Sequence, residues 1–378
     1  MHHIVFALFC AFATLFSTVS CSGATTAVSS TVADSIFLFV GSYSPAEKEG
    51  VVVFSFNQED GGYEYRSGLT GIANPSFLCV NKQGNRVYAV SEVGEPNASA
   101  HSLAFDSESA MLQHLNDAPT HGGAPCHIAL STTENYLYTA NYMGGSITEF
   151  PLDKDGHIGE GRTIPFVGNS VVKNRQDKPY LHATYFTPDG QFLLANDLGT
   201  DNIHAFPLQG EGDSICRNKG IDISLNPGTG PRHLCFHPNG KYAYLLGELS
   251  GEIHVLSLET GKWDVLQTIL ADSLQASGSA DIHCSPDGRF LYASHRLRGD
   301  GISVMRIQTD GTLQYISRQL TGIHPRNFAI TPNGKFLLVA CKDDNVIEIY
   351  RRNMQEGFLD DTKKRIPLSQ PVCLKFLQ

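Results

Sequence analysis

The chain has 378 residues, and its 28 Lys and Arg against 38 Asp and Glu give a formal net charge of −10 at pH 7. With 17% charged residues, 41% hydrophobic residues, 36 Gly and 18 Pro, the composition excludes a disordered chain, a collagen-like repeat and a long coiled coil. The acidic balance argues against nucleic acid as a partner, because phosphate binding requires a basic face. The length allows two or three ordinary domains or one large repetitive domain.

The amino end has the features of an export signal. Residues 4–16 are a nearly unbroken apolar run, long enough for the core of a signal peptide and too short to span a bilayer. Residues 18–21 (TVSC) resemble a bacterial lipoprotein cleavage site with Cys21 as the lipidated residue; an ordinary cleaved signal peptide with an incidental cysteine is the alternative. We therefore expect residues 1–21 to be a signal peptide and residues 22–34 a short linker. The mature protein is then exported, either to the periplasm or to a lipid anchor at the bacterial cell envelope.

One unit recurs six times after this segment: an apolar run, a polar turn that usually contains Pro and Gly, and a second apolar run. The turn position falls at Gly84, Glu134, Gly190, Gly240, Gly288 and Gly334, so successive units lie 50, 56, 50, 48 and 46 residues apart. Aromatic and β-branched runs on both sides of such a turn predict a β-hairpin. A third strand follows each hairpin, as in residues 146–151 and 301–307, and a less clearly marked fourth strand comes after it.

Four strands in every 46–56 residues is the period of a β-propeller blade. Residues 371–376 resemble the first strand of the unit, and residues 35–41 resemble its second strand. Joining these two ends completes a seventh blade and closes the ring. We therefore predict an all-β fold, in which residues 35–378 form a single seven-bladed β-propeller domain. Its blades are four-stranded and antiparallel, and the N- and C-terminal strands together close the last blade.

The alignment of the repeats also predicts where a site lies. A hairpin returns to the end from which it starts, so the start of each first strand and the end of each second strand share one rim of the central channel. This rim collects charged and polar residues that differ from blade to blade: His182, Arg232, Asp281 and Arg326 near first-strand starts, and Glu92, Asn141, Glu248 and Arg296 near second-strand ends. Guanidinium groups bind carboxylate or phosphate in a bidentate manner, so the rim predicts a small anionic ligand. The alternative is that charged residues simply favour loop ends.

An insert at residues 167–180 (VGNSVVKNRQDKPY) lengthens one spacing to 56 residues. It carries Lys173, Arg175 and Lys178 and leads directly into the rim at His182. We expect the insert to fold over the mouth of the channel; a solvated surface loop is the alternative.

These segments resemble the seven-bladed propeller lactonase family, which includes bacterial 6-phosphogluconolactonases and fungal carboxy-cis,cis-muconate cyclases. The resemblance covers nearly all the mature chain and is most specific in residues 230–249 (GPRHLCFHPNGKYAYLLGEL), 280–296 (ADIHCSPDGRFLYASHR) and 324–340 (HPRNFAITPNGKFLLVA). Residues 175–182 are similar to the Arg-Gln-x-x-Pro-His-x-His motif of many relatives. Tyr180 replaces the first of its two histidines, which argues against proton transfer at that position.

The resemblance implies a lactonase. In the muconate cyclase branch of the family, the catalytic set is a His, two Arg and a Glu on the channel rim, which by motif would be His182, Arg232, Glu248 and Arg296 here; Arg326 competes for the last role. A lactone hydrolase needs a base to activate water, for which His182 or Glu248 is suitable. It also needs fixed positive charge near the oxyanion, which Arg232 and Arg296 would supply. The residues expected to bind the substrate are Arg175, Gln176, Asp281, His283, Arg326, Glu92 and Asn141.

No cofactor and no metal is expected, although Glu92, Glu248 and Asp281 could converge on a cation. The expected partner is a small anionic lactone or sugar acid, and we expect a monomer or a weak dimer. The export signal favours an extracytoplasmic lactone over a phosphorylated cytosolic one, so the substrate stays open. Two other functions also stay open: a cyclising or isomerising enzyme of the muconate type, and a non-catalytic propeller that binds a carbohydrate or a protein.

Overall fold

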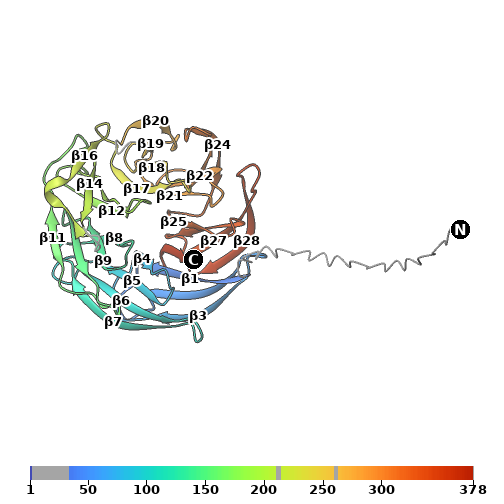
Figure 1. The fold of residues 1–378 in the computed structure, drawn as a ribbon, viewed down its shortest axis with the longest axis horizontal. Coiled ribbons are helices and arrows are strands. Elements are labelled where there is room, and N and C mark those ends of the chain that lie inside the picture. The colour runs from blue at the N-terminus through green and yellow to red at the C-terminus, as the bar shows by residue number, and fades with distance from the viewer. Residues whose placement is uncertain (2–33, 210–213, 259–262, 378) are drawn as a thin grey trace. The chain divides into compact units, whose positions relative to one another are not determined.

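The computed structural model describes Met1 and residues 34–209, 214–258 and 263–377. Apart from Met1 and Asp34, the expected signal peptide and linker lie outside the described residues. The described strands form seven antiparallel sheets, which are arranged as blades around a central channel (Figure 1). The prediction of a seven-bladed β-propeller is therefore confirmed. No helix of the described ranges has the length and apolarity needed to cross a membrane.

Counted from the channel outward, the first blade consists of β29 (Pro371–Phe376), β1 (Ser35–Ser42), β2 (Val51–Asn57) and β3 (Tyr63–Leu69). The second blade consists of β4 (Leu78–Val80), β5 (Arg86–Ser91), β6 (Ser99–Asp106) and β7 (Met111–Pro119). The third blade consists of β8 (Pro125–Leu130), β9 (Tyr136–Asn141), β10 (Ser146–Pro151) and β11 (Arg162–Pro165).

In the fourth blade, the strands are β12 (Leu181–Phe186), β13 (Phe192–Asp197) and β14 (Asn202–Gln209), and the outer position is shared by β15 (Ser214–Ile215) and β16 (Ile221–Ser224). A short 3-10 helix, η2 (Arg217–Lys219), lies between β15 and β16. The fifth blade consists of β17 (Pro231–Phe236), β18 (Tyr242–Gly247), β19 (Glu252–Ser257) and β20 (Val265–Leu270).

The sixth blade consists of β21 (Ser279–Cys284), β22 (Phe290–His295), β23 (Gly301–Ile307) and β24 (Leu313–Leu320). The seventh blade consists of β25 (Pro325–Ile330), β26 (Phe336–Cys341), β27 (Val346–Arg352) and β28 (Leu359–Pro367).

The ring closes through the two ends of the chain. β29 pairs with β1 in antiparallel register, with Val40 opposite Leu374, as the repeats predicted. The inner strands contact one another in the order of the blades, and β29 contacts both β25 and β4. The apolar core lies between neighbouring blades, so that Leu374 of the first blade packs in one cluster with Leu338 of the seventh.

A β-bulge near the start of the inner strand recurs in several blades. In β12, Leu181 pairs with Asp197 and Ala183 with Asn196, which leaves His182 without a partner in the ladder. The equivalent residues in the other strands with this bulge are Cys126 of β8, Arg232 of β17 and Arg326 of β25. A bulge re-aims the side chain of the extra residue. The repeated bulge therefore places one side chain per strand at the same end of the channel.

The second strands end at the same rim. The residue that follows each of them donates its backbone N–H to the segment before the inner strand: Glu248 to the carbonyl of Gly230 at 2.8 Å, and Arg296 to that of Gly278 at 3.1 Å. Gly230 has a φ of +63°, and a Cβ there would meet Cγ of Leu249 at 2.5 Å, so this link requires glycine. The starts of the inner strands and the ends of the second strands thus meet at one end of the channel.

Ring closure makes β29 a sensitive point for stability. Leu374 is 2% exposed between two blades, and Leu320 at the end of β24 is 65% exposed. We expect Leu374→Ala to lower the free energy of unfolding by about 2–5 kcal/mol, because truncation leaves a cavity in the closing strand. Leu320→Ala, the matched control, should change it by less than about 0.5 kcal/mol. Denaturant unfolding of both variants measures this; equal effects would contradict the role of β29 in closing the ring.

Candidate active site

A cavity of about 220 Å³ opens at the rim where the inner strands begin and the second strands end. Every blade contributes to its lining, which consists of Tyr43, Glu92, Cys126, Tyr142, His182, Glu248, Arg296 and Arg326. Five of these residues belong to the predicted site. The structure therefore brings Glu92, His182, Glu248, Arg296 and Arg326 together in one cavity.

Glu248 lies at the centre of a cluster of guanidinium groups. Its Oε2 accepts a hydrogen bond from Nε of Arg232 at 2.9 Å and lies 3.4 Å from Nη2 of Arg296. Its Oε1 accepts from Nη2 of Arg175 at 2.6 Å. Burial opposes ionisation of this carboxyl, but Arg296, Arg232 and Arg175 outweigh it and hold the pKa of Glu248 at about 2. Glu248 is therefore an anion that fixes three cations in place.

His182 faces the same carboxylate. Its Nε2 lies 3.8 Å from Oε2 of Glu248, and its Nδ1 lies 3.8 Å from Sγ of Cys126. Burial, together with the positive charge of Arg232, lowers the pKa of His182 well below its ordinary value of 6.5. The imidazole is thus neutral at pH 7, with a lone pair that can accept a proton.

Arg232 is almost completely buried behind Glu248 and does not belong to the cavity lining. Its Nε donates to Glu248, and its Nη1 donates to the carbonyl of Ala280. This differs from the expectation that Arg232 faces the reacting group. The guanidinium positions the carboxylate, and its side chain bridges the fifth and sixth blades.

Arg296 and Arg326 supply the positive charge that does line the cavity. Nε of Arg296 donates to the carbonyl of Gly278 at 2.9 Å, so its side chain is held by the rim itself. Arg326 lies with its guanidinium 5.3 Å from the centre of the Tyr43 ring, and its Nη2 is 3.9 Å from Oε2 of Glu92. Tyr43 in turn donates its hydroxyl to Glu92 at 2.9 Å.

The insert at residues 167–180 contacts the cavity lining through Arg175, which donates to Glu248. Gln176 does not line the cavity; its side chain is fully buried, with Nε2 bonded to the carbonyl of Leu198 at 2.8 Å and to Oδ1 of Asp201 at 2.7 Å. Its Oε1 accepts the N–H of Val172 at 3.0 Å. Because every polar atom of this amide holds the insert, Gln176 positions Arg175 and is not placed to contact a substrate.

Tyr180, which replaces a histidine of the family motif, is not among the residues that line the cavity. Its ring stacks on Tyr142 with centroids 4.8 Å apart, and its hydroxyl donates to Asp177 at 3.0 Å. Tyr180 therefore packs the base of the insert.

Asp281 and His283 lie deeper than expected, outside the cavity lining. The carboxylate of Asp281 is buried and accepts hydrogen bonds from Nδ1 of His233 at 2.7 Å, from Nε2 of His283 at 2.9 Å and from the amide of Asn327. His233 in turn packs against His182, with ring centroids 5.4 Å apart. The carboxylate of Asp281 is thus fully engaged by protein donors, and this explains why it holds a polar layer next to His182 instead of facing the cavity.

Asn141 also does not reach the cavity. Its side chain is completely buried within the third blade, where Nδ2 donates to Oγ of Ser146 at 3.0 Å and to Oγ1 of Thr148 at 2.9 Å. Its Oδ1 accepts from the hydroxyl of Thr139 at 3.0 Å. Asn141, the last residue of β9, therefore points into the blade, and the next residue, Tyr142, lines the cavity.

Sequence reasoning missed Tyr43, Cys126 and Tyr142 as lining residues. Cys126 is equivalent to Arg232 at the start of an inner strand, and Tyr142 follows a second strand as Glu248 does. Both are less polar than these counterparts. Tyr43 follows the end of β1 as Glu92 follows the end of β5, and this equivalence was the available signal. It was hidden because the split first blade has no hairpin turn from which to count.

The suggested cation site does not form. Among the described residues, Glu92, Glu248 and Asp281 do not bring their carboxylate oxygens together as one set of ligands. Their oxygens face arginine, tyrosine, histidine and asparagine donors instead.

Comparison with known proteins places this geometry in context. Residues 37–376 match the sequence family described as lactonase, 7-bladed beta-propeller. A 6-phosphogluconolactonase of Formosa agariphila is 36% identical over 347 residues, which cover 89% of this chain and 98% of that protein. A 6-phosphogluconolactonase of Bacillus subtilis is 30% identical over 347 residues, which cover 90% of this chain and 97% of that protein.

Two solved structures are also similar. A candidate 6-phosphogluconolactonase from Bacteroides fragilis has a TM-score of 0.88 and 43% identity, and covers 92% of this chain and 99% of its own. A periplasmic gluconolactonase from Pseudomonas aeruginosa has a TM-score of 0.84 and 29% identity, and covers 91% of this chain and 99% of its own.

The ion cluster predicts a specific dependence of stability on pH. The pKa of Glu248 is about 2 in the folded protein, against an ordinary value of 4.5. Its stabilisation is therefore complete above pH 4.5 and is lost as the pH falls through 2. We expect Glu248→Gln to lower the free energy of unfolding by about 3 kcal/mol at pH 6, and the difference from the unmodified protein to shrink between pH 4.5 and pH 2.

Glu59→Gln is the matched control, because Glu59 forms an exposed ion pair with Lys335. It should cost less than about 1 kcal/mol. Denaturant unfolding at several pH values measures both variants. A Glu248→Gln effect as small as that of Glu59→Gln, or one independent of pH in this range, would contradict the ion cluster.

Proposed function

Because the chain belongs to the seven-bladed β-propeller lactonase family, we propose that it hydrolyses a sugar-acid lactone in the cavity at the channel mouth. The observation that carries the proposal is the placement of a neutral His182 beside the guanidinium groups of Arg296 and Arg326 in one cavity. Hydrolysis of a lactone requires a proton acceptor and positive charge within reach of the same carbonyl group.

His182 is the better candidate for the base. The oxygens of Glu248 are engaged by three arginines, and a carboxylate with a pKa of about 2 is a poor proton acceptor at neutral pH. Nε2 of His182 takes a proton from water while the water oxygen attacks the lactone carbonyl. The imidazolium that forms lies 3.8 Å from Oε2 of Glu248, which stabilises it. It then returns the proton to the ring oxygen as the ester bond breaks, and the product is the open hydroxy acid.

Arg296 and Arg326 are the groups that line the cavity with positive charge. One guanidinium near the carbonyl oxygen stabilises the oxyanion, and the other binds an anionic group of the substrate. An anionic substrate also offsets the charge of Arg326, which is one of the groups that lower the pKa of His182. Substrate binding therefore raises the proton affinity of the base.

The names of the relatives support a sugar-acid lactone as the substrate class. Two curated relatives are called 6-phosphogluconolactonase, and one solved relative is called a periplasmic gluconolactonase. These names differ in the phosphate group. The excess of guanidinium groups at the cavity is compatible with phosphate or carboxylate, so the assay must include lactones with and without phosphate.

We expect His182→Gln to lower kcat for lactone hydrolysis about 10²- to 10⁴-fold, because the variant lacks the proton acceptor. The measurement is acid release from glucono-δ-lactone and from its 6-phosphate. His157→Gln is the matched control, since His157 is an exposed histidine paired with Asp153 outside the cavity, and it should keep the activity of the unmodified protein.

The other possible functions predict different results in the same experiment. Turnover that is unchanged in His182→Gln would contradict the proposed base. Failure to hydrolyse any lactone, with conversion between a muconate and its lactone, would favour the cyclising reaction. Tight binding of an unreacted glycan without any turnover would favour a non-catalytic propeller.

We also propose that the protein is exported and attached to the membrane through a lipid on Cys21. The support is the apolar run at residues 4–16 and the cleavage-site pattern that ends at Cys21. We expect Cys21→Ser to move the protein from the membrane fraction of bacterial cells to the soluble fraction, as detected by immunoblot. Cys10→Ser, within the apolar run, is the control and should leave the protein in the membrane fraction. A soluble unmodified protein would contradict the lipid anchor.

A further inference from the structure

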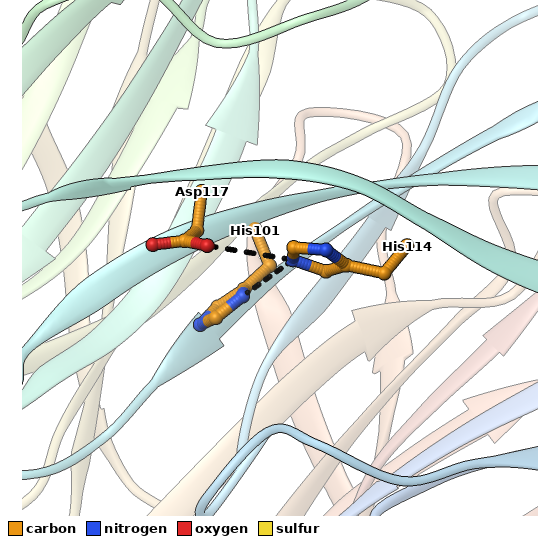
Figure 2. Close-up of side chains that lie close together, drawn as sticks. All are labelled: His101, His114 and Asp117. Atoms are coloured by element: carbon orange, nitrogen blue, oxygen red, sulfur yellow. Dashed lines mark hydrogen bonds and ion pairs between the residues drawn. The ribbon is translucent and has the colours of Figure 1, made fainter.

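Two histidines and an aspartate come together on the outer strands of the second blade, away from the cavity (Figure 2). Nδ1 of His101 lies 3.2 Å from Nε2 of His114, and Nε2 of His114 lies 3.7 Å from Oδ1 of Asp117. His101 belongs to β6, and the other two residues belong to β7. Figure 2 shows the three side chains turned toward one another from these neighbouring strands.

A β-bulge brings the three side chains to the same face of the blade. Residues three apart in a regular strand point to opposite faces, so His114 and Asp117 would normally be separated by the sheet. Here Asp117 pairs with His101, and the register then shifts so that His114 pairs with Leu103. The extra residue in β7 turns His114 back to the face of His101 and Asp117.

Two of the separations between the ligand atoms suit a small tetrahedral metal ion, and all three atoms lie within 4.8 Å of one another. Two ligands bound to zinc at about 2.0–2.2 Å in tetrahedral geometry lie about 3.3–3.5 Å apart. The observed separations of 3.2 Å and 3.7 Å bracket this value. We propose that His101, His114 and Asp117 form a binding site for a divalent transition-metal ion of the zinc class, with solvent in the remaining coordination position.

The surroundings of His101 fit this role. Its side chain is buried, and its Nε2 lies 2.9 Å from Oγ of Ser99. A metal-binding imidazole usually engages its second ring nitrogen in such a hydrogen bond, which fixes the orientation of the ring. His114 and Asp117 are exposed, with 39% and 53% of their side chains accessible, so an ion can enter from solvent.

The donor set also indicates which class of ion binds. Two imidazoles and one carboxylate are ligands that zinc and its first-row neighbours prefer, whereas calcium and magnesium prefer oxygen ligands throughout. The site does not contact the cavity residues, and its occupancy is therefore independent of the proposed lactonase activity.

Zinc binding to the purified protein tests the proposal, by competition with a chromophoric chelator. We expect about one equivalent of Zn²⁺ to bind, and expect His114→Ala to weaken the affinity more than about 100-fold, since loss of an outer hydrogen-bond partner alone costs 10–100-fold. His157→Ala is the matched control, because His157 is an exposed histidine beside a single carboxylate, Asp153, and it should bind zinc like the unmodified protein.

Thermal unfolding gives a second readout that does not depend on the chelator. Zn²⁺ should raise the Tm of the unmodified protein and of His157→Ala, but not that of His114→Ala or Asp117→Ala. Both of the latter residues are exposed, so these variants should fold normally in the absence of zinc. Equal zinc affinity in His114→Ala and the unmodified protein would overturn the proposal. So would an unmodified protein that binds no zinc, because the three side chains then form only a hydrogen-bonded surface cluster.

Discussion

A carboxylate buried among guanidinium groups determines how the rim of the channel is built. Glu248 comes from the fifth blade, and its partners come from the insert, from the bulge of β17 and from the rim of the sixth blade. Each arginine would repel the others in this buried setting without the carboxylate between them. The ion cluster therefore ties the insert to the fifth blade, and it also holds Arg296 next to Glu248. His182 acquires its neutral state and its nearby anion from the same arrangement.

A β-bulge that recurs near the start of several inner strands makes this cluster possible. A hairpin with perfect pairing would direct the second residue of each inner strand along the blade face. The bulges at His182, Arg232 and Arg326 turn these side chains toward the rim instead. A similar irregularity in β7 gathers His101, His114 and Asp117. In both places, one extra residue in a strand brings polar side chains together that a regular ladder would keep apart.

The sequence was sufficient to predict the blades, because each blade repeats the same hairpin and turn. The same periodicity predicted which residues approach the rim, since equivalent positions in a ring lie at equivalent heights. What it could not predict was the direction of individual side chains. Asn141 and Tyr142 are neighbours at the rim, yet the first bonds within its blade and the second lines the cavity. The direction depends on the bulge and on hydrogen-bond partners in other blades, which no local pattern records.

A second limit concerns residues that are polar for structural reasons. Gln176, Asp281 and Arg232 all belong to the predicted site, and all are buried with their polar atoms bonded to protein groups. A buried polar side chain must find such partners, so polarity at a rim position alone does not distinguish a substrate contact from a support. The cluster of His101, His114 and Asp117 shows that residues can also meet without any signal in the sequence. Its residues are thirteen and three positions apart, which is not a spacing of any familiar ligand motif, and only the register of two strands reveals it.

The net charge of −10 describes the whole chain and does not describe the charge distribution at the cavity. Among the described residues that line it, Arg296 and Arg326 carry positive charge and Glu92 and Glu248 carry negative charge, and Arg175 and Arg232 contact Glu248 from outside the lining. Burial lowers the pKa of Arg296 to about 9, opposed by Glu248 and reinforced by Arg232 and Arg326. Such a shift means that the cationic form of Arg296 is destabilised in the absence of a further anion. An anion bound near Arg296 would relieve this destabilisation.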